Sequence, residues 1–173
     1  MNDKLSMNDL GRMSSEEFKL AQKQPLIIVL DNIRSLNNVG SAFRTGDAFL
    51  IEAIYLCGVT GIPPNKEIEK TALGATDTVV WKYFKTTDEA ISELKEKNYF
   101  IASVEQAKQS VMLNKFLKPS QPIALVFGNE VYGVEQDIID RSDVCIEIPQ
   151  YGSKHSLNVS VTIGIVLWEL LKK

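Results

Sequence analysis

Three short stretches of this chain concentrate side chains that can bind a polar ligand, and each stretch follows an apolar run. They are residues 31–44, 128–133 and 150–158, which are rich in Gly, Asn, Ser and charged residues. Ligands of open α/β sheets bind beyond the carboxyl ends of the strands. We therefore expect the three stretches to converge on one site.

The first stretch, LDNIRSLNNVGSAFRTGD, combines helix-capping residues with an arginine. Asn37 or Asn38 can cap the helix that follows, and Gly40 allows a close backbone approach. Arg44 lies about one helical turn beyond Gly40, near free N–H groups that attract anions, and its planar guanidinium matches two phosphate oxygens. A capped helix with a solvated arginine explains this stretch equally well.

The second stretch, ALVFGNEVYGV, places Gly128 at the end of an apolar run and Gly133 before a helical pattern. Because Gly128 has no side chain, a flat ligand can lie against its backbone. A plain turn from strand to helix explains the same residues. The chain has neither a GxGxxG fingerprint nor a GxxxxGK[ST] loop, which disfavours common nucleotide-binding enzymes.

The third stretch, IPQYGSKHSLNVSV, has a proline that ends a strand and two residues that can cap the last helix, Ser156 and Asn158. Capping alone is an adequate explanation for both. His155 stands next to Ser156, but adjacent residues do not readily form a catalytic pair and the GxSxG elbow is absent. We interpret His155 as a loop residue rather than part of a hydrolase.

Short apolar runs alternate with helical patterns from residue 25 onward. Most of these runs are continuous, as expected for strands that are covered on both faces. The strand candidates are residues 25–30, 52–59, 78–84, 99–104, 122–127 and 143–149, and the helical patterns are residues 38–50, 86–98 and 131–142. Such βαβ repetition predicts a mostly parallel sheet flanked by helices.

The two ends of the chain also have helical features. Ser14 or Ser15 can cap a surface helix, with Glu17 as the partner in a capping box. The last segment, residues 157–173, alternates like a strand at first, yet its length without a turn favours a helix.

Composition restricts the class of protein. The chain has 173 residues, 45% of them hydrophobic and 24% charged, which is typical of one globular domain. It shows no apolar segment typical of a signal peptide or a membrane span, so we expect a cytoplasmic protein without membrane contact. The single histidine and two cysteines, Cys57 and Cys145, cannot supply a four-ligand zinc site, and we expect no metal and buried, inert thiols.

The net charge of −3 argues against a broad basic surface for nucleic acid. Basic residues can still gather on one face. The local cluster that we expect contains Arg34, Arg44, Arg141 and Lys154.

Taken in order, the three stretches resemble the three motifs of the SpoU (TrmH-like) class of SPOUT RNA methyltransferases. The first motif corresponds to Asn38-Val39-Gly40 with Arg44 six positions after the asparagine. The second corresponds to LVFGNE followed by Gly133, and the third to IEIP, a loop and SLNVSV. The resemblance runs from about residue 25 to the C-terminus. It divides the chain into an N-terminal helical extension, residues 1–24, and one methyltransferase domain, residues 25–173.

This resemblance implies a parallel α/β sheet whose C-terminal part forms a trefoil knot, a rare exception among protein folds. The last segment is then a helix. It also implies S-adenosylmethionine as cofactor and a homodimer that brings Arg44 and the cofactor together across the interface. The cofactor-binding positions that match are Phe127, Gly128, Asn129, Ile148 and Leu157.

The reaction that the resemblance implies is methyl transfer to a ribose 2′-hydroxyl of RNA. Arginine is a poor base, so Arg44 is expected to stabilise the developing alkoxide while water or a substrate phosphate accepts the proton; its own deprotonation is the other account. Glu130 orients Arg44 or the substrate, Asn38 and Asn158 hold the ribose or a phosphate, and Ser156 supports its loop.

The chain departs from many relatives in two respects. Its 24 residues before the domain leave no room for the RNA-binding domain of many rRNA-modifying relatives, which favours tRNA over rRNA. Thr162 stands where, or next to where, relatives often have a small residue. The alternative functions are a non-catalytic RNA-binding or assembly factor with the same knotted fold, and an unrelated α/β nucleotide-binding protein.

Overall fold

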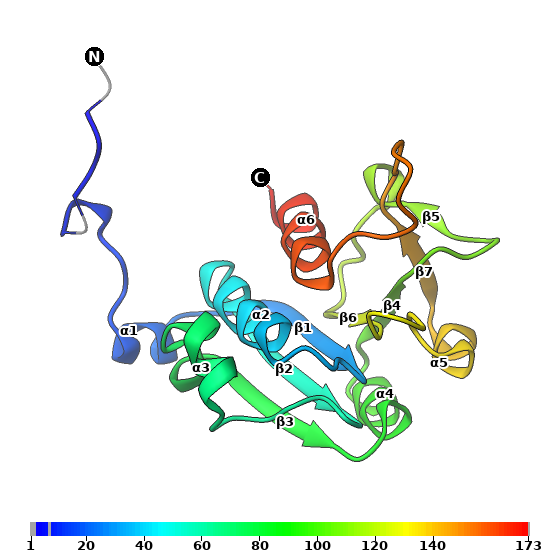
Figure 1. Ribbon diagram of the computed structural model, residues 1–173, viewed down its shortest axis with the longest axis horizontal. Coiled ribbons are helices and arrows are strands. Elements are labelled where there is room, and N and C mark those ends of the chain that lie inside the picture. Colours follow the sequence, from blue (N-terminus) through cyan, green and yellow to red (C-terminus); the bar gives the residue numbers. More distant parts are fainter. Residues whose placement is uncertain (1–2, 7, 173) are drawn as a thin grey trace.

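The centre of the structure is a sheet of parallel strands in the order β3-β2-β1-β6-β4-β7-β5 (Figure 1). This computed structural model describes residues 3–6 and 8–172. The strands are β1 Gln24–Asp31, β2 Ile51–Cys57, β3 Val80–Phe84, β4 Phe100–Val104, β5 Val111–Met112, β6 Ile123–Phe127 and β7 Val144–Glu147. The expectation of a parallel α/β sheet is confirmed.

Helices cover both faces of this sheet (Figure 1). They are α1 Ser15–Leu20, α2 Leu36–Ala48, α3 Lys66–Ala72, α4 Thr87–Glu96, α5 Gln136–Arg141 and α6 Val159–Leu171, with short 3₁₀ turns at Asn8–Leu10, Ala75–Asp77 and Leu113–Lys115. Within the described residues, no helix has the length and apolar character to cross a membrane.

Alternating side chains of the central strand divide the core between the two faces. Leu26, Ile28 and Leu30 of β1 pack with α2, α3 and α6, whereas Ile27 and Val29 pack with α4 and α5. Successive side chains of a strand point to opposite faces, so a strand that is buried on both sides must be apolar throughout. This explains why the strands appear in the sequence as continuous apolar runs.

The predicted elements correspond closely to those observed. Each of the six strand candidates contains a strand, the last segment is helix α6, and Ser14 and Glu17 form the expected capping box before α1. The sequence analysis missed α3 and the two-residue strand β5. Seven residues of mostly polar sequence, KEIEKTA, form α3, which buries only Ile68 and Ala72 and so shows little periodicity.

Helix α2, which carries the first motif, is packed closely against α3 at Gly40. A Cβ atom at this position would lie 2.1 Å from Oγ1 of Thr71 and 2.2 Å from the carbonyl oxygen of Ile68. The glycine therefore permits the contact between the two helices, which fixes the position of the first motif relative to the sheet.

Replacing Gly40 by alanine should lower the free energy of unfolding by about 1–3 kcal/mol, because the helices must separate to admit the methyl group. Urea unfolding of the wild type and the variant measures this difference. The neighbouring substitution Ser41→Ala is the control and should change the stability by no more than about 0.5 kcal/mol. Equal stabilities of Gly40→Ala and Ser41→Ala would contradict the packing argument.

Candidate active site

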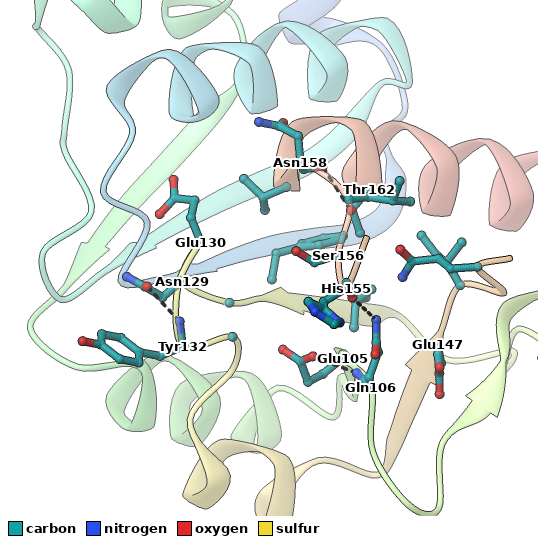
Figure 2. A pocket seen from close by; sticks show the side chains of 18 of the residues that line it. Glu105, Gln106, Asn129, Glu130, Tyr132, Glu147, His155, Ser156, Asn158 and Thr162 are labelled. Carbon is teal, nitrogen blue, oxygen red and sulfur yellow. Dashed lines mark hydrogen bonds between the residues drawn. The ribbon is translucent and has the colours of Figure 1, made fainter. Parts of the chain in front are cut away.

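The carboxyl ends of β4, β6 and β7 surround a cavity of about 480 Å³ (Figure 2). The second and third stretches both line it, and the first stretch lies beside it through Asn38. All five predicted cofactor-binding residues are among the lining residues: Phe127, Gly128, Asn129, Ile148 and Leu157. Of the predicted catalytic residues, Glu130, Ser156 and Asn158 line the cavity as well.

The β6–α5 loop is held in shape by Asn129. Its backbone pairs with that of Gly133 in both directions, at 3.0 and 2.9 Å. Its side-chain oxygen accepts from the backbone N–H groups of Val131 and Tyr132, and its side-chain nitrogen donates to the carbonyl oxygen of Asn32 at 2.7 Å. A single side chain thus fixes the loop and attaches it to the end of β1.

The structure gives a different reason for Gly128 from the one that we expected. A Cβ atom there would lie 2.1 Å from the carbonyl carbon of Gly133 and 2.1 Å from the nitrogen of Val134. The chain's own backbone fills the space where a side chain would project. The glycine is required by the closure of the loop. Gly128 also lines the cavity, and the expectation that a flat ligand lies against its backbone stays a prediction.

A chain of hydrogen bonds joins the three motifs. The side-chain nitrogen of Asn38 donates to Glu130 at 3.0 Å, and the side-chain nitrogen of Asn158 donates to the oxygen of Asn38 at 3.2 Å. Asn158 is also the N-cap of α6, where its oxygen accepts from the backbone nitrogen of Ser160. The N-termini of α2 and α6 are thereby held together beside the cavity.

Glu130 also binds the backbone that leads into α2. Its carboxylate accepts from the backbone nitrogens of Arg34 and Ser35, each at 3.0 Å. Burial alone would raise the pKa of Glu130, but the hydrogen bonds from Arg34, Asn38 and Ser35 outweigh it and lower the pKa below its ordinary value. The N-cap of α2 is Ser35, so the expectation of Asn37 or Asn38 as the cap is wrong.

Arg44 is not brought to the cavity within one chain. Its side chain is exposed on α2, and it is not among the residues that line the cavity. Glu130 forms its hydrogen bonds with the start of α2 and with Asn38 rather than with Arg44.

Sequence reasoning missed three polar residues of the cavity: Glu105, Gln106 and Glu147 (Figure 2). Glu105 accepts from the backbone nitrogen of Val134 at 3.0 Å, and Gln106 donates to the carbonyl oxygen of His155 at 2.7 Å, which ties the end of β4 to both loops. Glu105 and Gln106 directly follow the strand candidate 99–104, and this position was the signal that could have identified them. His155 lies in a loop, as expected.

The lining of the cavity is acidic. It includes the carboxylates of Glu105, Glu130 and Glu147, and no lysine or arginine is found among the lining residues that the structure describes. The expected basic cluster does not form as a whole, because Arg141 lies on α5 and pairs with Asp88 in the first turn of α4. Arg34 is exposed beside the cavity.

The two cysteine thiols are poorly suited to act as nucleophiles or metal ligands, because both functions need the thiolate. Cys57 is buried, and this burial raises its pKa to about 12. Cys145 is only half-buried, contrary to expectation, and burial raises its pKa as well. In the part of the chain that the structure describes, no group of three or more His, Cys, Asp or Glu residues is arranged to hold a metal ion.

Comparison with known proteins identifies the family. The model of the SpoU rRNA Methylase family matches residues 25–168. The chain belongs to this family. A SpoU-family relative, the 23S rRNA (guanosine-2′-O-)-methyltransferase RlmB of Neisseria meningitidis, is 32% identical over 84% of this chain and 57% of its own length. The chain spans between 57% and 59% of the first three curated relatives.

Solved structures of the SpoU family have the same fold. The TrmH/SpoU tRNA modifying enzyme of A. aeolicus is 32% identical, with a TM-score of 0.78 over 90% of this chain and 77% of that one. An AdoMet-bound rRNA methyltransferase from Sinorhizobium meliloti is 27% identical, with a TM-score of 0.80 over 86% of this chain and 56% of that one.

The lowered pKa of Glu130 predicts a pH dependence of stability. The ionised carboxylate contributes stability above the pKa of the unfolded chain, whose ordinary value is 4.5, and this contribution is lost as the pH falls through the lower pKa of the folded chain. Wild type should therefore exceed Glu130→Gln in free energy of unfolding at neutral pH, and the difference should shrink on acidification to about pH 3. Urea unfolding across this range measures it. A difference that stays constant or grows in acid would contradict the role of the carboxylate.

Proposed function

We propose that this SpoU-family chain is an S-adenosylmethionine-dependent RNA methyltransferase that acts on a ribose 2′-hydroxyl of tRNA or rRNA. The observation that carries the proposal is the cavity itself. It is lined by the five residues assigned to the cofactor and by three of those assigned to catalysis, and the bond from Asn158 to Asn38 joins it to the first motif. A non-catalytic factor would not need this full set.

The residues of the cavity fit S-adenosylmethionine. The volume of the cavity, about 480 Å³, is within the range of small-molecule sites. Ile148 and Leu157 offer apolar surface for an adenosine group, and the backbone at Gly128 offers polar atoms. The acidic lining suits the positive charge of a sulfonium and an ammonium group.

Bound S-adenosylmethionine supplies an electrophilic methyl group for in-line transfer, so the task of the protein is mainly to position the ribose. Asn38 and Asn158 present amide groups where the two helices meet, and there they hold the ribose or its phosphate. Glu130 is a positioning residue, because it holds Asn38, and Ser156 supports the loop that includes Leu157. Arg44 stabilises the developing alkoxide while water or a phosphate accepts the proton.

The same proposal extends to the knot and to the domain limits. Strand β7 lies between β4 and β5, and α6 then returns to pack on α2 (Figure 1). This return path supports a trefoil knot in the C-terminal part of a methyltransferase domain, residues 25–173, preceded by a helical extension, residues 1–24. We place the activity in the cytoplasm.

Among RNA substrates we favour tRNA. The support is the likeness to the tRNA modifying enzyme of A. aeolicus, which is 32% identical over 90% of this chain.

The enzymatic proposal predicts transfer of a tritiated methyl group from S-adenosylmethionine to tRNA or rRNA isolated from a strain that lacks the gene. Arg44→Ala should reduce the rate by about 100-fold or more, because a charge that stabilises a transition state contributes at least this much. The affinity for S-adenosylmethionine, measured by calorimetry, should not change. No transfer by wild type above the Arg44→Ala background would contradict enzymatic activity on these RNAs, and wild type without cofactor affinity would favour a non-catalytic factor.

We further propose that the active form is a homodimer in which Arg44 serves the cavity of the other copy. Helix α6 exposes Val161, Ile165 and Trp168 at helical spacing, with exposed fractions of 50%, 38% and 65%. An apolar stripe of this kind marks an interaction surface. A second copy packed on it can also supply the arginine that one chain alone does not bring to its own cavity.

Complementation between two inactive variants tests this shared site. Arg44→Ala removes the arginine, and Leu157→Trp fills the cavity at a half-exposed position. A co-expressed equal mixture should regain about a quarter of wild-type activity, because half of the dimers are mixed and each has one intact site. Ultracentrifugation confirms the dimer. A mixed dimer without activity would contradict sharing of the site.

A further inference from the structure

An aromatic side chain that has no role in the proposed mechanism lies at the rim of the cavity. Tyr132 is 84% exposed and belongs to the lining residues, and Figure 2 shows its ring at the edge, on the outer side of the β6–α5 loop. Val131 beside it is 65% exposed. The loop therefore presents an apolar tip to solvent next to the proposed site of methyl transfer.

The tip is rigid rather than loose. The backbone nitrogen of Tyr132 donates to the side chain of Asn129 at 3.2 Å, and that of Val131 donates to the same oxygen at 2.9 Å. The reciprocal backbone pair between Asn129 and Gly133 closes the turn. With the backbone held in this way, only the side-chain torsions of Tyr132 remain to be fixed when a planar ligand stacks on its ring.

The surroundings of the tip favour nucleic acid. Glu130, two residues before Tyr132, accepts from the backbone nitrogen of Arg34, so the backbone of an exposed arginine lies close to the tip. Arg34 forms no ion pair with any residue that the structure describes. An aromatic face with an adjacent free cation offers stacking for a base and attraction for its phosphate.

We propose that Tyr132 is a stacking platform for a base of the RNA that enters the site, so that the enzyme selects an unpaired nucleotide. The inference rests on the proposed methyltransferase function. Stacking uses the π-face that every base has, so Tyr132 contributes affinity without reading the sequence. An RNA segment whose bases are already paired and stacked does not offer such a face.

The test measures the half-saturating RNA concentration and kcat for methyl transfer to RNA from a strain that lacks the gene. Tyr132→Ala should raise the half-saturating concentration by about 10-fold and leave kcat within about 2-fold. Tyr132→Phe should match wild type, because stacking needs the ring and not the hydroxyl. Tyr132→Leu should behave like Tyr132→Ala, since it restores apolar volume without a ring.

Two further measurements separate stacking on RNA from other roles. Calorimetry should give the same Kd for S-adenosylmethionine in wild type and Tyr132→Ala; weaker cofactor binding would overturn the proposal, because the ring would then serve the cofactor. Tyr151, 96% exposed but not among the lining residues, provides the matched control. Tyr151→Ala should keep the wild-type half-saturating concentration, and an equal loss there would overturn the assignment to the tip.

Each remaining outcome is also decisive. An active wild type whose half-saturating concentration is unchanged in Tyr132→Ala, or is restored in Tyr132→Leu, overturns the stacking platform and leaves the methyltransferase function intact. A wild type that transfers no methyl group overturns the proposed function itself.

Discussion

The site depends on a short run of hydrogen bonds from Glu130 through Asn38 to Asn158. These residues come from parts of the chain that are 92 and 120 positions apart. Two neutral amides and one carboxylate join the N-termini of α2 and α6, and a shift of either helix would break these hydrogen bonds. The cavity beneath them is therefore shaped in advance of any ligand.

The sheet and a few loop-binding side chains hold these hydrogen-bonded residues in place. The sheet supplies a stiff base, because its central strands β1, β2, β4 and β6 are buried on both faces and the parallel strands end at one edge. The loops are then fixed to that base by single side chains: Asn129 binds the backbone after β1, and Glu105 binds the backbone before α5. These side chains thus hold the loops in fixed positions relative to the strands.

The sequence predicted most of this arrangement, because its main signals are local. Continuous apolar runs reveal doubly covered strands, and the convergence of polar stretches follows from the rule that parallel strands end at one edge. Contacts between residues far apart in the sequence could not be predicted in this way. Ser35 is as good a helix cap as Asn37 or Asn38, so local preference does not decide between them. Nothing near Asn38 indicates that it bridges two other motifs, and nothing near Arg141 indicates its pairing with Asp88. Helix α3 was missed because a short, mostly exposed helix has too little buried surface to create a pattern.

The close contact at Gly128 bears on how glycines in such motifs are interpreted. The backbone of Gly133 and Val134 occupies the space beside its α-carbon, whatever lies in the cavity. A protein of this fold that had lost its cofactor would still need glycine here to close the loop. Glycine at this position is thus explained by the folding of the loop alone, and catalysis must be judged from side chains such as that of Arg44, which is exposed on α2.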